Sequence, residues 1–140
     1  MKITLNPQAK DAATRDALVA EGGFGKYYTD HMVVCEWTEK DGWAEPELKP
    51  YGPLSLDPAT AVFHYGQEIF EGMKAYRQPD GSIALFRPDA NSKRFANSAK
   101  RLALPEMPDA LFLETVETLV KQDAGWVPNN VGESLYIRPF

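Results

Sequence analysis

Two turn signals, each containing Asp-Gly, constrain this chain more than any other feature of its sequence. They are Lys40-Asp41-Gly42-Trp43 and Gln78-Pro79-Asp80-Gly81. Asp-Gly tolerates the positive φ values of tight hairpin turns, and Pro-Asp-Gly is a turn sequence for the same reason. We therefore expect two β-hairpins. Because the two strands of a hairpin are antiparallel, the sheet is expected to be mostly antiparallel.

The segments that flank these turns are the expected strands. Residues 27–38 and 43–49 flank the first turn, and residues 73–77 and 82–87 flank the second. Pro46 lies within 43–49 and lacks the backbone N–H that a sheet ladder needs. The segment 43–49 is therefore expected at an edge of its sheet.

Helices are expected between and after the hairpins. One should begin at Asp57, a favourable N-cap that Pro58 follows, and end at Gly72, because apolar residues recur between them at roughly helical spacing. Residues 89–103 and 108–123 each carry an apolar stripe of helical period, and residues 134–140 are expected to form a last strand. The stripe of the 89–103 helix consists of Phe95, Ala99 and Leu102.

The order of these elements predicts the α+β class, with helices packed on a mostly antiparallel sheet. Residues 1–23 are interpreted as an N-terminal arm with a short helix near residues 14–20, which Gly22 and Gly23 end. Residues 24–140 are expected to form one small α+β domain. No internal repeat or low-complexity segment divides it.

The composition argues against several kinds of partner. Fifteen Lys and Arg against twenty Asp and Glu give a net charge of −5, which argues against nucleic acid and anionic membranes. No apolar run approaches the roughly 20 residues that a membrane helix needs. Residues 1–7 lack the apolar segment of a signal peptide, so the expected location is the cytoplasm.

Cysteine and histidine usage narrows the chemistry further. Cys35 is the only cysteine, so the chain forms no internal disulfide and has no multi-cysteine metal site. His31 and His64 are the only histidines, and neither has a neighbour at zinc-ligand spacing or beside a serine nucleophile. Gly22-Gly23-Phe24-Gly25 precedes a strand rather than a helix, so it does not have the pattern of a phosphate-binding loop. We expect no metal site.

Three places carry residues suited to anion or substrate binding, and each has a plainer alternative. In the last strand, Tyr136 and Arg138 should project on the same face, where they could receive a carboxylate or simply be solvated. Arg94 lies near a helix start and could hold a phosphate, although its lysine and arginine neighbours favour a solvated face. His64 and Tyr65 sit among apolar residues, where a structural role is the common one.

The combination of these residues resembles a known family. The similarity extends from Phe24 to Phe140 and is to the bacterial form of the branched-chain amino-acid aminotransferases, which are pyridoxal-phosphate enzymes of the D-amino-acid-aminotransferase-like fold. The strings that carry it are Phe24-Gly25-Lys26-Tyr27-Tyr28-Thr29-Asp30-His31-Met32, His64-Tyr65-Gly66-Gln67-Glu68-Ile69-Phe70-Glu71-Gly72-Met73-Lys74-Ala75-Tyr76 and Ser134-Leu135-Tyr136-Ile137-Arg138-Pro139.

The resemblance implies roles for particular residues. Arg94 would bind the cofactor phosphate. Tyr65 would reach across a homodimer interface into the neighbouring subunit's site. Arg138 would help to hold the side-chain carboxylate of glutamate or 2-oxoglutarate. The apolar pocket would be lined by Phe24, Phe70 and Tyr136. This pocket would accept the side chain of leucine, isoleucine or valine.

The resemblance also implies that the chain is the small domain of a larger enzyme. The family's Schiff-base lysine belongs to its large C-terminal domain, and neither Lys74 nor Lys93 has a counterpart to it. The chain ends at Phe140, inside an expected strand, and truncation before the large domain is the interpretation. We expect no catalytic residue and no turnover in this chain alone.

Two alternatives remain. The chain could be a non-catalytic module that forms dimers or binds anions. It could also be the small domain of another enzyme of the same fold, such as a D-amino-acid transaminase or an aminodeoxychorismate lyase.

Overall fold

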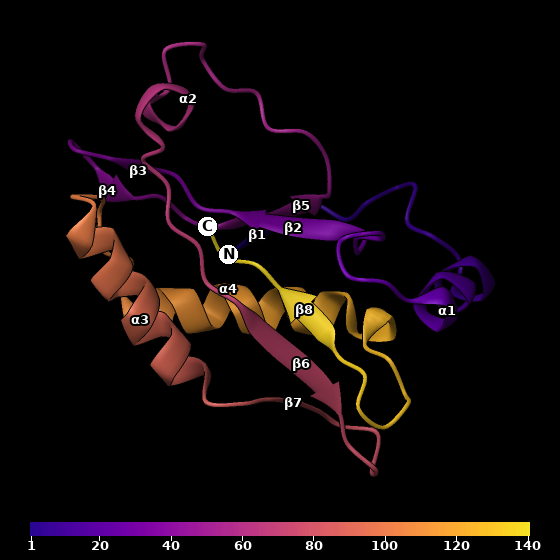
Figure 1. The fold of residues 1–140 in the computed structure, drawn as a ribbon. Coiled ribbons are helices and arrows are strands. Elements are labelled where there is room, and N and C mark those ends of the chain that lie inside the picture. The colour runs from indigo at the N-terminus through magenta and orange to yellow at the C-terminus, as the bar shows by residue number, and fades with distance from the viewer.

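The observed structure, a computed structural model that describes residues 1–140, contains short sheets, helices and long connections (Figure 1). It confirms the α+β class. In chain order the elements are β1 Lys2–Ile3, α1 Ala12–Glu21, β2 His31–Val34, β3 Trp37–Thr38, β4 Gly42–Trp43, β5 Glu47–Pro50, α2 Ala61–Tyr65, β6 Met73–Arg77, β7 Ile83–Leu85, α3 Pro88–Arg101, α4 Asp109–Gln122, a 3-10 turn η1 Ala124–Trp126, and β8 Leu135–Ile137.

Both predicted hairpins are present. Strands β3 and β4 pair antiparallel across the first turn, where Gly42 has φ +72°, and β6 and β7 pair antiparallel across the second, where Gly81 has φ +84°. The strand predicted over residues 27–38 is shorter than expected and interrupted, because only β2 and β3 within that range are strands.

The prediction that residues 43–49 form an edge is wrong for β5. The strand order is β1-β5-β2, so β5 is central, paired parallel with β1 and antiparallel with β2. Pro46 lies just before β5 and needs no ladder donor, and its carbonyl accepts a hydrogen bond from the Lys2 N–H at 2.9 Å. Strand β1 thus pairs with the side of β5 that the sequence predicted to be a free sheet edge.

The predicted helix from Asp57 to Gly72 is also wrong in extent, because only α2 is helical. The Asp57 carboxylate accepts a hydrogen bond from the Ala59 N–H at 2.7 Å, which makes a turn before the helix rather than a cap on it. Gly66 then ends α2 in the left-handed conformation, with φ +58°. Phe70 therefore lies outside the helix, in the connection that leads into β6.

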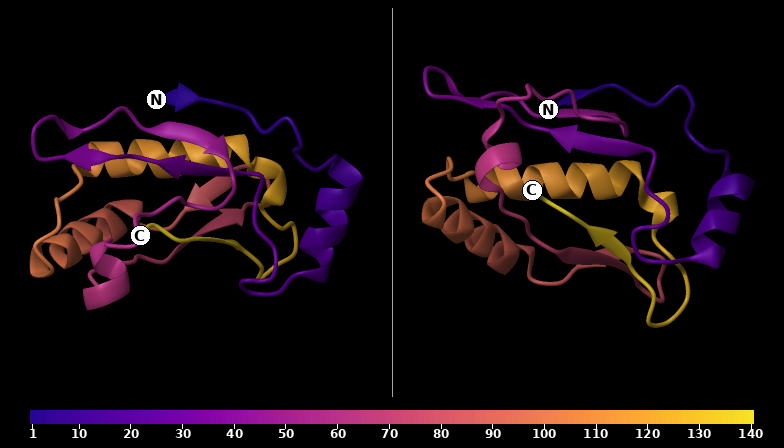
Figure 2. Two further views of the ribbon diagram at one scale, coloured as in Figure 1. Left: turned by 90° about the horizontal axis from the view of Figure 1, so that it is seen from above. Right: turned by 45° about the horizontal axis from the view of Figure 1, so that its top comes forward.

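The hydrophobic core lies where α3 and α4 pack on the β7-β6-β8 sheet. Helix α4 runs between this sheet and the β1-β5-β2 sheet (Figures 1 and 2). Helices α3 and α4 match the predicted ranges closely, although Leu102 lies beyond the end of α3 and is 39% exposed rather than buried. The core consists of Met73, Ala75, Phe95, Phe112, Val116, Val120, Val127 and Ile137. No helix is both long and apolar enough to span a bilayer.

Candidate functional site

Four of the six expected site residues lie in contact with one another. The ring of Phe24 packs edge-on against that of Tyr136, with centroids 4.9 Å apart. The Arg138 guanidinium lies 4.5 Å from the Phe70 ring centroid and 5.2 Å from that of Tyr136. Arg138 also donates hydrogen bonds to the Tyr136 phenol oxygen, from Nη2 at 2.8 Å and from Nε at 3.2 Å. We call these four residues the aromatic–arginine cluster.

The alternation of β8 produces this cluster, as the sequence predicted. Ile137 points into the core and is 8% exposed, so Tyr136 and Arg138 occupy the opposite face of the sheet. Gly72 makes room for the phenol, because a Cβ atom at that position would lie 2.4 Å from the Tyr136 Oη. The cluster therefore depends on a glycine beside the tyrosine.

Arg94 is held by Glu71, a residue that the sequence analysis did not select. Arg94 Nε donates to Glu71 Oε2 at 2.7 Å, and Arg94 Nη2 donates to Glu71 Oε1. The Glu71 side chain is 3% exposed whereas that of Arg94 is 67% exposed. Hydrogen bonding from Arg94, against the opposing effect of burial, lowers the pKa of Glu71 below its ordinary value of 4.5.

The setting of Arg94 differs from the expected one. Helix α3 begins at Pro88, so Arg94 lies in its second turn, away from the free N–H groups at the start. Asp89 occupies the first turn, where its charge disfavours an anion. Any anion at Arg94 would therefore be bound by the side chain and not by the helix terminus.

The two site arginines approach one segment from opposite faces of the sheet. Residues 70–72 lead directly into β6, and their contacts fall on two sides. Phe70 lies against Arg138 and Gly72 against Tyr136, while Glu71 turns toward α3 and Arg94. The Glu71 N–H donates to the Pro139 carbonyl at 2.8 Å, which continues the pairing of β6 with β8. The three consecutive residues therefore join Arg94 to the aromatic–arginine cluster.

Tyr65 lies apart from these groups. It is in α2, it is 85% exposed, and its only aromatic neighbour is His64, with ring centroids 6.3 Å apart. His64 itself bonds to the Pro58 carbonyl at 2.8 Å, which agrees with its structural interpretation. In Figure 1, α2 projects from the body of the molecule on a long connection. The structure does not bring Tyr65 to the cluster of the same chain.

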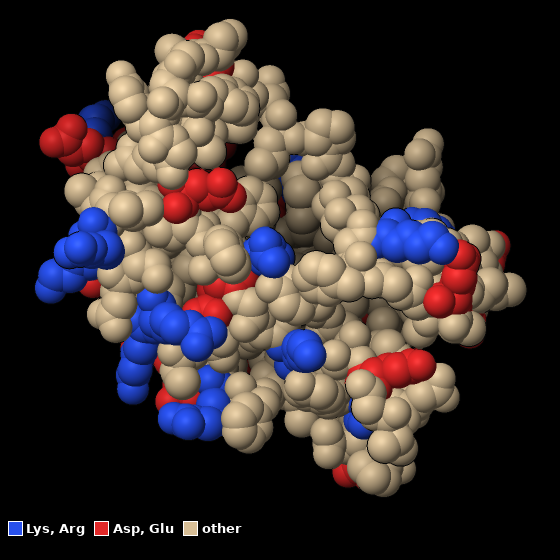
Figure 3. Space-filling model, viewed as in Figure 1, with Lys and Arg blue, Asp and Glu red and all other residues tan.

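Lysine and arginine side chains gather over α3, at the left of Figure 3. Lys93, Lys100 and Arg101 form no ion pair, so Arg94 is the one basic residue of this helix that is paired with a carboxylate. No group of three or more His, Cys, Asp and Glu residues is arranged to hold a metal ion.

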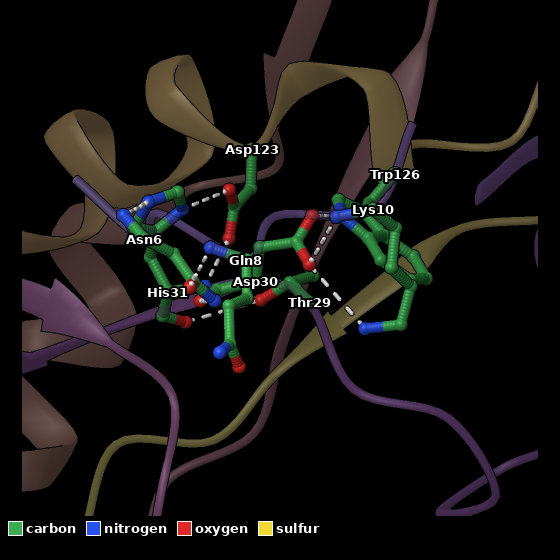
Figure 4. A network of polar contacts seen from close by, with 8 residues as sticks. All are labelled: Asn6, Gln8, Lys10, Thr29, Asp30, His31, Asp123 and Trp126. Carbon is green, nitrogen blue, oxygen red and sulfur yellow. Dashed lines mark hydrogen bonds and ion pairs between the residues drawn. The ribbon is translucent and has the colours of Figure 1, made fainter. Parts of the chain in front are cut away.

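A second polar group that the sequence analysis missed is buried between α4, η1 and the N-terminal segment (Figure 4). Asp30 accepts from the Trp126 indole N–H at 2.9 Å, and from the backbone N–H and Nζ of Lys10 at 3.1 and 3.3 Å. Asp123 accepts from the backbone N–H of His31 at 3.0 Å and lies 2.7 Å from its Nδ1. These contacts fasten the start of β2 to the end of α4.

The hydrogen bonds of His31 assign its tautomer. Its Nε2 accepts from the Asn6 N–H at 2.9 Å, so this nitrogen carries no proton. The proton of the neutral ring therefore lies on Nδ1 and is donated to Asp123. Both ring nitrogens of His31 are therefore hydrogen-bonded. Its side chain is buried, with the residue 5% exposed, so its role is structural.

The stability of this group should fall in acid through Asp30. Burial raises the pKa of Asp30, but bonds from Trp126 and Lys10 more than offset this and lower it below its ordinary value of 3.8. A lowered pKa contributes stability that is fully present above 3.8 and is lost as the pH falls through the folded-state pKa. The free-energy advantage of the protein over its Asp30→Asn variant should therefore shrink below this pH. Urea unfolding followed by tryptophan fluorescence from about pH 6 to about pH 2.5 measures it, and a difference that stays constant would contradict the assignment.

Comparison with known proteins identifies relatives over nearly the entire chain. No family model matches. The chain is 55% identical over 141 residues to a probable branched-chain-amino-acid aminotransferase of Streptomyces coelicolor, a match that covers 99% of this chain and 39% of the relative. It is 52% identical over 139 residues to a branched-chain-amino-acid aminotransferase of Mycolicibacterium smegmatis, with 99% and 38% covered. A cytosolic enzyme of the same name from Saccharomyces cerevisiae is 48% identical, with 99% and 36% covered.

These relatives confirm the resemblance to branched-chain-amino-acid aminotransferases. They favour that family over the D-amino-acid transaminases and the aminodeoxychorismate lyases. The chain spans less than two fifths of the length of each of these three relatives.

Proposed function

We propose that this chain is part of a pyridoxal-phosphate-dependent aminotransferase that exchanges the amino group between leucine, isoleucine or valine and 2-oxoglutarate. The observation that carries the proposal is the 55% identity to a probable branched-chain-amino-acid aminotransferase across 99% of the chain. The proposed compartment is the cytoplasm, and the proposed assembly is a homodimer.

The chemistry of Arg94 fits the phosphate of the cofactor. Glu71 occupies the edge of the guanidinium formed by Nε and Nη2, and no side chain bonds to Nη1. The outer edge of an exposed guanidinium can donate two parallel hydrogen bonds to phosphate oxygens. Pyridoxal phosphate, when bound, supplies the electron sink for amino-group transfer. Arg94 would anchor it through the phosphate.

The aromatic–arginine cluster suits a site that accepts two kinds of side chain. Phe24 and Phe70 are 80% and 63% exposed, so they offer apolar surface for a branched aliphatic chain. Arg138 has no carboxylate partner and rests on the Phe70 and Tyr136 rings. It could pair with the distal carboxylate of 2-oxoglutarate without being a buried, unpaired charge when leucine is bound.

Tyr65 suits a contact between subunits better than one within this chain. An 85% exposed tyrosine on a projecting helix presents a rigid ring and a hydroxyl to whatever faces it. We propose that this partner is the site of the second subunit of a homodimer.

Transaminase assays test the proposal. The protein expressed from its complete reading frame, supplied with pyridoxal phosphate, leucine and 2-oxoglutarate, should form glutamate and the branched 2-oxo acid. The 140-residue chain alone should form neither, because no residue in it is proposed as the Schiff-base lysine. Absence of activity in the complete protein, with folding verified, would refute the proposed function.

Replacing Arg138 with methionine should separate the two substrates. The apolar stem of the methionine can still pack on Phe70, but the positive charge is lost. We expect kcat/KM for 2-oxoglutarate to fall about tenfold or more while that for leucine changes by about threefold at most. A Lys100→Met control, which removes a cation far along α3, should leave both values unchanged. Equal losses for the two substrates would contradict the role given to Arg138.

A further inference from the structure

Glu71 is the only buried carboxylate that the structure places against a site arginine. Both of its oxygens are engaged: Oε2 by Arg94 Nε at 2.7 Å, and Oε1 by Arg94 Nη2 and by the Gly72 N–H, the latter at 2.7 Å. Its side chain is 3% exposed. A carboxylate with so many fixed donors has little freedom to reorient.

The backbone around Glu71 is held as well. Its N–H donates to the Pro139 carbonyl at 2.8 Å, and the next residue, Gly72, accepts from Asn91 Nδ2 at 3.2 Å. The first contact comes from the extension of β8 and the second from α3. Glu71 is therefore fixed from both elements that carry the site arginines.

These contacts decide which part of Arg94 faces solvent. A guanidinium has one edge formed by Nε and Nη2 and another formed by Nη1 and Nη2. Glu71 holds the first edge on its buried side, so the second points outward from a side chain that is 67% exposed. Without this clamp a long exposed arginine would sample many rotamers.

We propose that Glu71 is a positioning residue that presents the outer edge of Arg94 to the phosphate of the cofactor. This inference rests on the proposed function, since it takes Arg94 as the phosphate ligand. Glu71 touches neither phosphate nor substrate and acts through Arg94. The two neighbours of Glu71 belong to the other part of the site: Phe70 contacts Arg138, and Gly72 lies against Tyr136. The same segment therefore fixes the position of Arg94 relative to the aromatic–arginine cluster.

The charge of Glu71 works against phosphate binding, and its orienting effect works for it. The outer edge of Arg94 lies in water, where the repulsion between a carboxylate and a phosphate on opposite sides of a guanidinium is weakened by the high dielectric and by salt. Ordering a free arginine side chain, in contrast, is a cost that water does not reduce. The orienting effect is therefore the larger one.

Binding of two forms of the cofactor tests the proposal in the complete protein after the cofactor has been removed. Equilibrium dialysis measures the dissociation constants of pyridoxal phosphate and of pyridoxal, which lacks the phosphate. Glu71→Gln should weaken pyridoxal phosphate about tenfold and pyridoxal by less than about twofold. Glu71→Asp retains the charge but shortens the reach, and it should also weaken pyridoxal phosphate selectively. Glu117→Gln, which breaks an exposed pair with Lys121, should change neither constant.

Arg94→Gln distinguishes failure of this inference from failure of the proposed function. It should weaken pyridoxal phosphate strongly and pyridoxal little, and Glu71→Gln should then add no further loss in the double variant. If Arg94→Gln leaves pyridoxal phosphate binding intact, the phosphate role of Arg94 fails and the inference falls with it. If Arg94→Gln weakens binding but the Glu71 variants do not, or if they tighten it, the inference alone is overturned. Equal weakening of both ligands by Glu71→Gln would show a merely structural role.

Discussion

Gly72→Ala is expected to lower kcat/KM for leucine about 100-fold in the complete protein, while reducing stability by only about 1 kcal/mol. The added Cβ would lie 2.4 Å from Tyr136 Oη, 3.2 Å from its Cζ and 3.3 Å from its Cε2. No contact that close is tolerated, so the phenol must move. Its ring is half-buried and can swing outward, which keeps the stability cost small. The movement breaks the hydrogen bonds from Arg138 and the edge-on contact with Phe24.

Steady-state kinetics and thermal unfolding, measured on the same samples, test this expectation. Gly52→Ala is the matched control, because a Cβ there would meet no atom within 4 Å and its φ lies outside the left-handed region. It should change neither quantity. Wild-type kinetics in Gly72→Ala would show that the position of Tyr136 does not matter for substrate binding, and would remove the aromatic–arginine cluster from the proposed site.

The elements that the sequence predicted well are those that short-range patterns determine. Helices α3 and α4 each have an apolar stripe of helical period, and both hairpins have a turn sequence with its own conformational preference. The pairing of Tyr136 with Arg138 follows from the two-residue period of a single strand. None of these features requires knowledge of a distant part of the chain.

The errors concern interactions between distant residues. The centre of a sheet was predicted as an edge because β1, more than 40 residues before β5, supplies the missing neighbour. The apolar residues between Asp57 and Gly72 have helical spacing, but the segment packs little of its surface, and Gly66 ends the helix after one turn and a half. A helix gains most of its stability from a packed face, so spacing alone was insufficient.

In the candidate site, too, the residues could be predicted from local patterns, whereas contacts between distant residues could not. Its aromatic and arginine residues could be selected from the sequence, and four of the six contact one another. Glu71 was visible inside the string Phe70-Glu71-Gly72, yet nothing local indicated that its partner is Arg94, 23 residues later. The members of each buried pair, Asp30 with Trp126 and His31 with Asp123, are likewise separated by more than 90 residues. A single sequence carries no signal for such pairs.

Asp123→Ala is expected to destabilise the protein by about 3–5 kcal/mol, because it leaves two buried donors of His31 without an acceptor. The carboxylate is 4% exposed and accepts from the backbone N–H of His31 and from its Nδ1. The ring cannot turn to recover, since its Nε2 is already engaged by the Asn6 N–H. Loss of Asp123 should therefore loosen β2, the N-terminal segment and the end of α4 together.

Urea unfolding monitored by tryptophan fluorescence measures this loss, and Trp126 reports on the affected region directly because it bonds to Asp30. Asp16→Ala, which removes an exposed carboxylate paired with Arg15, is the control and should stay close to wild type. Asp123→Asn offers one acceptor oxygen and places an amide against the second donor, so its loss should be intermediate. If Asp123→Ala unfolds at the same urea concentration as the control, His31 finds other partners at little cost. The buried group would then not be what fastens the start of β2 to the end of α4. Its geometry requires Asp123→Ala to lower the free energy of unfolding by at least about 3 kcal/mol.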